Sequence, residues 1–437
     1  MSRRPLLAAL IGLTAVLALL AAGCGGGGGS SSGGNAQALP ASSCSDIYYE
    51  GDGSPEFVIA SDLPLQGSGR SQTVQMTEAI KFVLKQHDFK AGDTKIGYQS
   101  CDDATAQEGA WASEKCAANA QAYAQNKSVI GVIGTFNSGC AEIEIPINNR
   151  ASGGPLAQIS PANTYVGLTH GGPGTAPGEP NKNYPTGKRN YARVVAADDF
   201  QGAADATLAQ QMGVKSLYIL NDKEAYGLGV ATNTKNAAKK LGIKIAGFTA
   251  WDGKASSYEA TALKIAKSGA QAVFLGGLIC ENGGKLIKDL RAGAPKVSIL
   301  APDGFTPVSA DVSQSAGKAE GMTVSVAGLP NEKLPAAGKA FVAAFAKANG
   351  GKAPDPYSVY AAAAAEVMIG AIAASDGSRA SITDQMFKVS VPTVLGTIKF
   401  NKNGDVTSNP VTIYKIVKGK AKTLKVIVPS NSLVASA

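Results

Sequence analysis

Val129-Ile130-Gly131-Val132-Ile133-Gly134 is an almost wholly apolar run, and Thr135-Phe136-Asn137-Ser138-Gly139 follows it directly. A short run that is apolar at consecutive positions is typical of a central parallel strand buried on both faces. The small and polar residues after it predict a turn into a helix, whose free N–H groups favour an anion such as a carboxylate. The stretch therefore predicts a strand inside a parallel sheet, with a polar loop at its carboxyl end.

The same unit, an apolar strand followed by an amphipathic helix, repeats on both sides of this run. A first set of strands is expected at 57–60, 95–100 and 155–160, with helices at 74–86 and 110–124. A second set of strands is expected at 217–220, 243–248, 272–276 and 297–300, with helices at 202–212, 227–241, 258–267 and 283–291. Repeated β-α units predict an α/β fold with two doubly wound parallel-sheet lobes. Ligands of such sheets lie outside the carboxyl ends of the strands.

The C-terminal part of the chain adds helices and then strands, so it is expected to return to each lobe in turn. Helices are predicted at 334–349 and 357–374 and strands at 322–326, 396–400, 412–417 and 424–428. Between the two sets of β-α units, the proline- and glycine-rich segment Gly167–Asn190 is longer than most connections in a compact domain. It is either a functional loop or a surface insertion, and the insertion is favoured.

The composition excludes several classes of protein. His87 and His170 are the only two histidines in 437 residues, so a multi-histidine metal site or a histidine-based triad is hard to build. There is no Gly-x-Ser-x-Gly elbow between a strand and a helix, since the pattern occurs only within the Gly/Ser tract after Cys24, and His-Glu-x-x-His does not occur. The net charge of +8 is spread thinly, without a block of about five or six basic residues. No metal, cofactor or nucleic acid partner is therefore expected.

The N-terminus reads as a secretory signal. Two arginines precede an uncharged stretch over 6–22, and small residues lead into Cys24. This pattern resembles a bacterial lipobox, which implies a lipoprotein signal peptide over 1–23 and a lipid on Cys24. A single transmembrane anchor is the alternative, but the apolar stretch is short for a span of about 20 residues. Residues 24–54, which begin with a Gly/Ser tract, are expected to be a tether that holds an extracytoplasmic body to the membrane.

The cysteines agree with export, because disulfides are permitted outside the cytosol. Without Cys24, five remain: Cys44, Cys101, Cys116, Cys140 and Cys280. The odd number leaves at least one thiol free or paired with another chain. Cys101 and Cys140 each follow a predicted strand, so this pair is the favoured disulfide. The alternative is that some or all of the five are buried thiols.

Several short segments, taken in order, resemble one family. They are Ser61-Asp62-Leu63-Pro64-Leu65-Gln66-Gly67, Gly134-Thr135-Phe136-Asn137-Ser138, Ile159-Ser160-Pro161-Ala162-Asn163-Thr164, Asn221-Asp222-Lys223-Glu224-Ala225-Tyr226-Gly227 and Ala301-Pro302-Asp303-Gly304. Their order and spacing resemble the branched-chain amino-acid-binding proteins of ABC importers, of the type I periplasmic-binding fold. The resemblance implies a hinge of three crossings, near Val195, Met322 and Val394. It divides the chain into an N-terminal lobe of 55–195 and 323–394 and a C-terminal lobe of 196–322 and 395–429.

The resemblance also implies a binding site between the lobes. Ser138 matches a serine that holds the α-carboxylate of the ligand, and Ala162 matches a residue whose carbonyl accepts from the ammonium. Thr164 matches a threonine that serves both ends. Tyr226 matches a tyrosine that closes over the ligand, and Asp303 stands where a glutamate neutralises the ammonium. The remaining expected ligand contacts are Ser68, Asn137, Asn163 and Leu278.

The sequence departs from the family at the side-chain pocket. Ser68 stands in place of a tryptophan, with Arg70 close by, and Leu278 stands in place of an aromatic residue. Arg70 is a candidate to select a second carboxylate on the ligand. The resemblance implies a monomeric, lipid-anchored protein that captures an amino acid and delivers it to the permease of an ABC importer. The alternatives are a sensory module on the same fold and, much less favoured, a secreted hydrolase.

Overall fold

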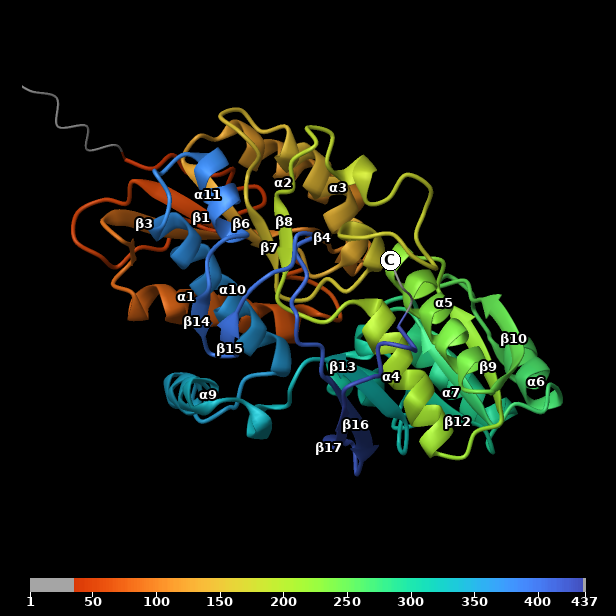
Figure 1. The fold of residues 1–437 in the computed structure, drawn as a ribbon. Coiled ribbons are helices and arrows are strands. Elements are labelled where there is room, and N and C mark those ends of the chain that lie inside the picture. The colour runs from red at the N-terminus through yellow and green to blue at the C-terminus, as the bar shows by residue number, and fades with distance from the viewer. Residues whose placement is uncertain (1–34, 435–437) are drawn as a thin grey trace, which may run out of the picture. The chain divides into compact units, whose positions relative to one another are not determined.

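Two parallel-stranded sheets organise the chain in the computed structural model, which describes residues 35–434 (Figure 1). The predicted α/β fold with two lobes is confirmed, since each sheet carries its own set of helices. The predicted signal sequence over 1–23, the lipidation site Cys24 and the tether up to residue 34 lie outside the described residues.

The sheet of the first lobe has the strand order β2-β3-β1-β6-β7-β8. Its strands are β1 (Phe57–Leu63), β2 (Lys90–Ala91), β3 (Thr94–Asp102), β6 (Val129–Gly134), β7 (Gln158–Ser160) and β8 (Tyr191–Arg193). All neighbours pair in parallel except β2, which is antiparallel to β3. The apolar run that forms β6 is buried at all six positions, as expected for a strand covered on both faces.

Helices cover both faces of this first sheet. They are α1 (Arg70–Gln86), α2 (Ser113–Gln125), α3 (Ser138–Asn149), α9 (Ala336–Ala348), α10 (Pro356–Ala373) and α11 (Arg379–Met386). Ile133 of β6 joins the core that includes α1 and α10, whereas Val132 joins the core of Tyr123 in α2. The apolar helix α10 is long enough to cross a membrane, but 78% of it is buried, because it packs between α1 and the sheet. It is a core helix.

The sheet of the second lobe has the order β10-β9-β11-β12-β13-β16-β17. Its strands are β9 (Ser216–Asn221), β10 (Lys244–Ala250), β11 (Ala272–Gly276), β12 (Ser298–Ala301), β13 (Thr323–Ala327), β16 (Val411–Val417) and β17 (Lys420–Ile427). Its helices are α4 (Asp198–Gln211), α5 (Ala225–Lys240), α6 (Glu259–Lys267), α7 (Gly283–Gly293) and α8 (Val308–Gln314). The last two strands are antiparallel, and the others are parallel.

The chain crosses between the lobes three times, but two crossings lie later than the sequence predicted. The strand β13, expected to begin the returning part of the first lobe, pairs with β12 and β16 and so belongs to the second sheet. The short strands β14 (Val391–Thr393) and β15 (Gly396–Ile398) form one hairpin, which packs on α10 of the first lobe. The boundaries at 322/323 and 394/395 are therefore wrong. The pairing of β13 with β16, which is distant in the sequence, assigned β13 to the second sheet, whereas β14 and β15 pair only with each other.

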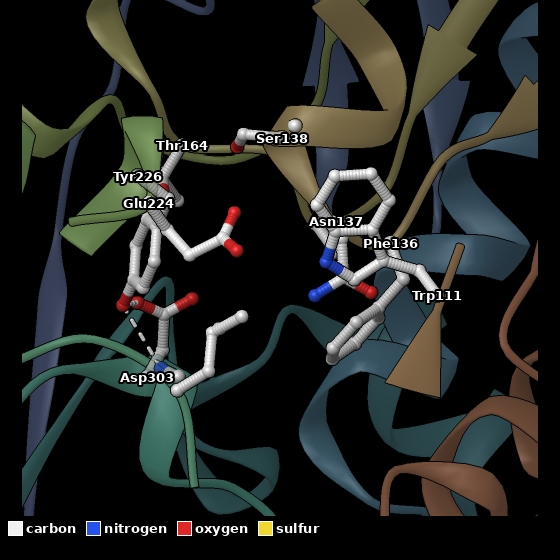
Figure 2. Close-up of a pocket in the computed structure, with 12 residues that line it drawn as sticks. Trp111, Phe136, Asn137, Ser138, Thr164, Glu224, Tyr226 and Asp303 are labelled. Carbon is white, nitrogen blue, oxygen red and sulfur yellow. Dashed lines mark hydrogen bonds between the residues drawn. The ribbon is translucent and has the colours of Figure 1, made fainter. Parts of the chain in front are cut away.

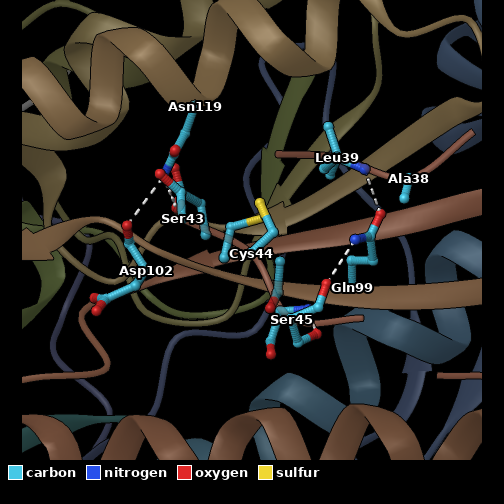
Figure 3. Close-up of a disulfide and its surroundings, with 12 residues drawn as sticks. Ala38, Leu39, Ser43, Cys44, Ser45, Gln99, Asp102 and Asn119 are labelled. Carbon is cyan, nitrogen blue, oxygen red and sulfur yellow. Dashed lines mark hydrogen bonds between the residues drawn. A yellow bond between two sulfur atoms is a disulfide. The ribbon is translucent and has the colours of Figure 1, made fainter. Parts of the chain in front are cut away.

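Residues 35–54 are part of the folded body and not of the tether that the sequence predicted (Figure 3). The backbone of Tyr48 exchanges hydrogen bonds with Tyr98 of β3, at 2.7 and 3.0 Å. Leu39 is buried, and its N–H donates to Gln99 Oε1 at 2.8 Å. A disulfide joins Cys44 of this segment to the end of β3. The described part of the predicted tether is therefore fixed along the first sheet.

The predicted Cys101–Cys140 disulfide is wrong. Cys101 pairs with Cys44, and Cys140 pairs with Cys116. The second bridge forms because α2 and α3, which carry its two cysteines, pack against one another. Within the described part of the chain Cys280 alone remains a thiol, and it is partly exposed.

The segment Gly167–Asn190 is more than a surface insertion. Tyr184 is buried, and its hydroxyl donates to the carbonyl of Leu168 at 2.5 Å. From the second lobe, Asn233 of α5 donates to the carbonyl of Pro173 at 3.2 Å. The segment is thus packed internally and touches both lobes.

Buried carboxyl groups gather beside the Cys116–Cys140 bridge. Asp62, Asp103 and Glu144 are fully enclosed, and Asn119 Nδ2 donates to Asp62 Oδ1 at 2.9 Å. Burial raises the pKa of Asp62 to about 6, although contacts with Glu144 and Asn119 act in the opposite direction. Burial also raises the pKa values of Asp103 and Glu144 well above their usual range. The folded state therefore holds protons here that the unfolded chain releases.

The variant Asp62→Asn is expected to be more stable than the wild type near neutral pH. The pKa of Asp62 is raised from 3.8 to about 6, so stability falls as the pH rises from about 4 to about 6. The shift corresponds to a loss of up to about 3 kcal/mol. Asparagine carries no proton to lose, so urea unfolding of the variant at about pH 4 and pH 7 should show a smaller fall in the free energy of unfolding. An unchanged fall would contradict this assignment.

Candidate ligand-binding site

A cavity lies where the carboxyl ends of strands from both lobes meet (Figure 2). Its lining residues come from loops that follow strands and from the helix starts beside them. They are Trp111, Phe136, Asn137, Ser138, Gly139, Ala162 and Thr164 of the first lobe, and Glu224, Tyr226, Leu278, Asp303 and Gly304 of the second. The seven predicted residues Asn137, Ser138, Ala162, Thr164, Tyr226, Leu278 and Asp303 are thus brought together.

The first wall of the cavity is the loop after β6. Gly134 ends the strand, and a Cβ atom there would lie 2.6 Å from the carbonyl oxygen of Asp62, so only glycine fits. The loop then turns into α3, with Asn137 at its N-cap and Ser138 at its first position. The Ser138 hydroxyl accepts from the N–H of Tyr165 at 3.3 Å. The free N–H groups at the start of this twelve-residue helix carry partial positive charge, which suits a carboxylate.

The loop after β7 places Ala162 and Thr164 beside that helix start. The Ser160 hydroxyl accepts from the N–H groups of Ala162 and Asn163, at 3.1 and 2.8 Å, and so fixes the turn. The Asn163 side chain does not line the cavity. Its Nδ2 donates to the carbonyl of Phe136 at 2.9 Å, so it ties the two loops together. Asn163 is not among the residues that line the cavity, so the structure does not support the expectation that its side chain contacts the ligand directly.

The opposite wall centres on Asp303, which follows β12 and is 7% exposed. Its carboxylate accepts from the hydroxyls of Tyr226, at 2.7 Å, and Tyr357, at 2.5 Å. Tyr226 Oη in turn accepts from the N–H of Gly304 at 2.9 Å. Burial raises the pKa of Asp303, while the two phenols oppose this by stabilising the carboxylate. Because Tyr357 lies on α10, the acid of the second lobe bonds to a residue of the first.

The sequence interpretation missed Trp111 as a site residue. It placed a helix over 110–124, but Ala110–Trp111 forms β5, which pairs with β4 (Ala104–Thr105), and α2 begins only at Ser113. This hairpin holds the indole against the cavity (Figure 2). An aromatic residue two positions before a helix-starting serine, as in Trp111-Ala112-Ser113, is the signal that could have indicated it.

Ser68 and Arg70 lie differently from what the resemblance implied. Ser68 lines a second cavity that adjoins the first and shares Trp111 and Leu278 with it. Arg70 is exposed at the start of α1 and lines neither cavity. The suggestion that Arg70 selects a second carboxylate is therefore wrong for this structure.

The charge in the cavity is negative. Glu224 and Asp303 both line it, and among its described lining residues none is lysine, arginine or histidine. Burial, reinforced by Glu281, raises the pKa of Glu224 to about 7. The site can therefore receive a carboxylate at helix α3 and positive charge at its acids.

The fold and this cavity define a two-lobed binding protein, in which a small ligand is enclosed between the strand ends of two α/β lobes. The chain belongs to the periplasmic binding protein family, which matches residues 58–421. The resemblance to the branched-chain amino-acid-binding proteins is confirmed at the level of this family. Membership makes the chain a binding protein and not an enzyme.

Individual relatives agree with this placement. The Leu/Ile/Val-binding protein homolog 1 of Brucella abortus is 24% identical over 379 residues, which are 85% of this chain and 94% of the relative. The solved leucine-binding protein of Thermotoga maritima has a TM-score of 0.73 at 20% identity, covering 86% of this chain and 99% of its own. A solute-binding protein of R. palustris in complex with benzoate has a TM-score of 0.69 at 18% identity, and the match covers 87% of this chain and 97% of that protein. At these identities, the two structures establish the shared fold.

Proposed function

We propose that this chain is an extracytoplasmic solute-binding protein that captures an amino acid in the cavity between its lobes and delivers it to the permease of an ABC importer. One observation carries the proposal: the start of α3, with the Ser138 hydroxyl, faces the buried carboxylate of Asp303 across one cavity. A buried zwitterion needs a partner for each of its charges, and this pair supplies both.

The roles of the lining residues follow from that arrangement. Ser138 and the Thr164 hydroxyl donate to the ligand α-carboxylate, together with the first N–H groups of α3. The Ala162 carbonyl and the Asp303 carboxylate accept from the α-ammonium. Tyr226, held by its bond to Asp303, covers the ligand from the second lobe. Closure of the lobes around a hinge completes these contacts, and the closed form is the one that the permease recognises.

The charge balance favours an amino acid over a purely anionic ligand. One relative of the same fold binds benzoate, which carries a carboxylate and no cation. In this chain a benzoate-like anion would share the cavity with Glu224 and Asp303, without a basic residue among the described lining residues. An α-ammonium group removes this conflict, since it neutralises the acid that faces it.

Trp111 offers a direct test of ligand capture. The sequence holds two tryptophans, and the other, Trp251, is buried at 3% exposure away from the cavity lining. In the variant Trp251→Phe, saturable quenching or a shift of the Trp111 emission is expected on titration with a binding amino acid. A folded protein whose emission and melting temperature respond to no amino acid would refute the proposal.

We further propose that a lipid on Cys24 anchors the protein and that it works as a monomer. The support is the signal-like stretch over 6–22 and the Gly/Ser tract after Cys24. Cells fed with labelled palmitate should incorporate the label into the wild type and not into Cys24→Ala. Equal labelling of both would rule out this anchor.

A further inference from the structure

The Glu224 side chain points into the cavity, where its carboxylate lies beside Gly139 at the start of α3. Glu224 is the N-cap residue of α5, and its carboxylate extends toward the space between Thr164 and Trp111 (Figure 2). No described side chain donates a hydrogen bond to it. Asp303, in contrast, has two phenol donors. The two acids of the cavity are therefore not equivalent, and an α-ammonium held by Asp303 leaves the charge of Glu224 unneutralised.

The surroundings of Glu224 are acidic as well. Burial raises the pKa of Glu224, and Glu281, on the loop after β11, raises it further. The pKa of Glu281 is itself raised by burial and by Glu108 of the first lobe, while Lys254 lowers it. Asp222 is buried on the same loop as Glu224, with its carboxylate occupied by the N–H groups of Glu224 and Leu278 at 3.0 and 2.9 Å. A field of one sign in a partly enclosed cleft concentrates ligands of the opposite sign.

The walls beside Glu224 suit an apolar stem that ends in a cation. The indole of Trp111 lies across the cavity from it, and an aromatic face attracts an ammonium or guanidinium group. Leu278 lines both the main cavity and the adjoining one, where Ile279 and Pro64 continue the apolar surface. A flexible aliphatic chain can lie along this surface while its charged end reaches an acid.

We infer that the ligand is an amino acid whose side chain ends in an ammonium or guanidinium group, and that Glu224 is the residue that selects it. The inference rests on the proposed function, since Asp303 and the start of α3 hold the α-amino and α-carboxylate groups. Glu224 and Trp111 then bind the distal cation, which a branched-chain side chain lacks.

Calorimetry of the full mature protein with lysine, arginine and leucine tests this inference. The wild type should bind lysine or arginine at least about tenfold more tightly than leucine. Glu224→Gln should weaken binding of that basic ligand by roughly 30-fold or more, because a buried charge partner is lost. The affinity of Glu224→Gln for leucine should stay within about threefold of the wild-type affinity. The exposed glutamate Glu114 on α2 provides the control Glu114→Gln, which should change neither affinity.

The affinity for the basic ligand should also depend on pH. Because the pKa of Glu224 is about 7 in the empty cavity, a cation must expel a proton to bind below that pH. The affinity should fall about tenfold between pH 8 and pH 6 in the wild type, and the fall should vanish in Glu224→Gln. Glu281, Asp222 and Asp303 also face this region, so a fall that persists in Glu224→Gln would assign the effect to them and overturn the inference.

The outcomes separate this inference from the proposed function. Tighter binding of leucine than of either basic amino acid, or equal losses for both ligands in Glu224→Gln, would overturn the inference and leave the proposed function standing. Absence of binding by every amino acid would overturn both.

Discussion

The variant Asp303→Asn is expected to lose amino-acid binding almost completely. Removing one member of a buried, hydrogen-bonded charge pair costs about 2–5 kcal/mol, which corresponds to an increase in Kd of roughly 30-fold to several thousandfold. The change is nearly isosteric, and one of the two phenols, Tyr226 or Tyr357, can still donate to the amide oxygen while the other accepts from the amide nitrogen. Isothermal titration calorimetry with the ligand that binds the wild type measures the loss.

Stability distinguishes this effect from unfolding. Burial raises the pKa of Asp303, so in the empty protein its charge is a cost to the folded state. The melting temperature of ligand-free Asp303→Asn should therefore equal or exceed that of the wild type. An affinity within about threefold of the wild type would show that Asp303 does not hold the ammonium.

The variant Arg193→Met is expected to lower the free energy of unfolding by about 3–5 kcal/mol, because it removes the arginine from a buried network of charges and hydrogen bonds around Asp405. Arg193 is completely buried at the end of β8, and its Nε donates to Asp405 at 2.8 Å. Its Nη1 donates to the carbonyls of Asn163 and Tyr165, at 3.1 and 2.8 Å, and its Nη2 donates to the Thr169 hydroxyl. Arg193 thus joins the cavity-lining loop after β7 to Asp405, which lies in the segment between β15 and β16.

His170 extends this network to the second lobe. Its ring nitrogens lie 3.1 Å from Asp405 Oδ2 and 3.2 Å from Asp199 Oδ2, at the start of α4. Burial lowers the pKa of His170, but the two carboxylates outweigh it and raise the pKa to about 9. Urea unfolding at about pH 7 measures the loss in Arg193→Met, and the exposed arginine in Arg150→Met is the control, expected within about 0.5 kcal/mol of the wild type. A loss below about 1 kcal/mol for Arg193→Met would contradict the structural role given to Arg193.

Much of the site could be predicted because strand ends and helix starts are local features. The apolar run of β6 and the polar loop after it pointed to Asn137 and Ser138, and the loop after β7 pointed to Thr164, whereas the family resemblance identified Tyr226 and Asp303. In parallel sheets the strand order brings such loops to one edge without further information. The family resemblance then supplied their roles.

The errors concern contacts between distant parts of the chain. Tyr357 lies 54 residues from Asp303, and nothing local to α10 shows that its hydroxyl reaches that acid. Cys44 bridges to Cys101 over 57 residues, from a segment whose composition resembled a linker. The assignment of β13 to the second sheet depends on its pairing with β16, which is also far along the chain. Local pattern cannot determine such pairings.

Calorimetric titration of the ligand-stripped, refolded protein with the twenty protein amino acids tests the central claim most directly. The account predicts saturable binding of at least one amino acid at a single site, lost in Asp303→Asn and retained in Glu114→Gln. A folded protein that binds no amino acid, or that binds an aromatic acid such as benzoate with equal strength in the wild type and in Asp303→Asn, would contradict it.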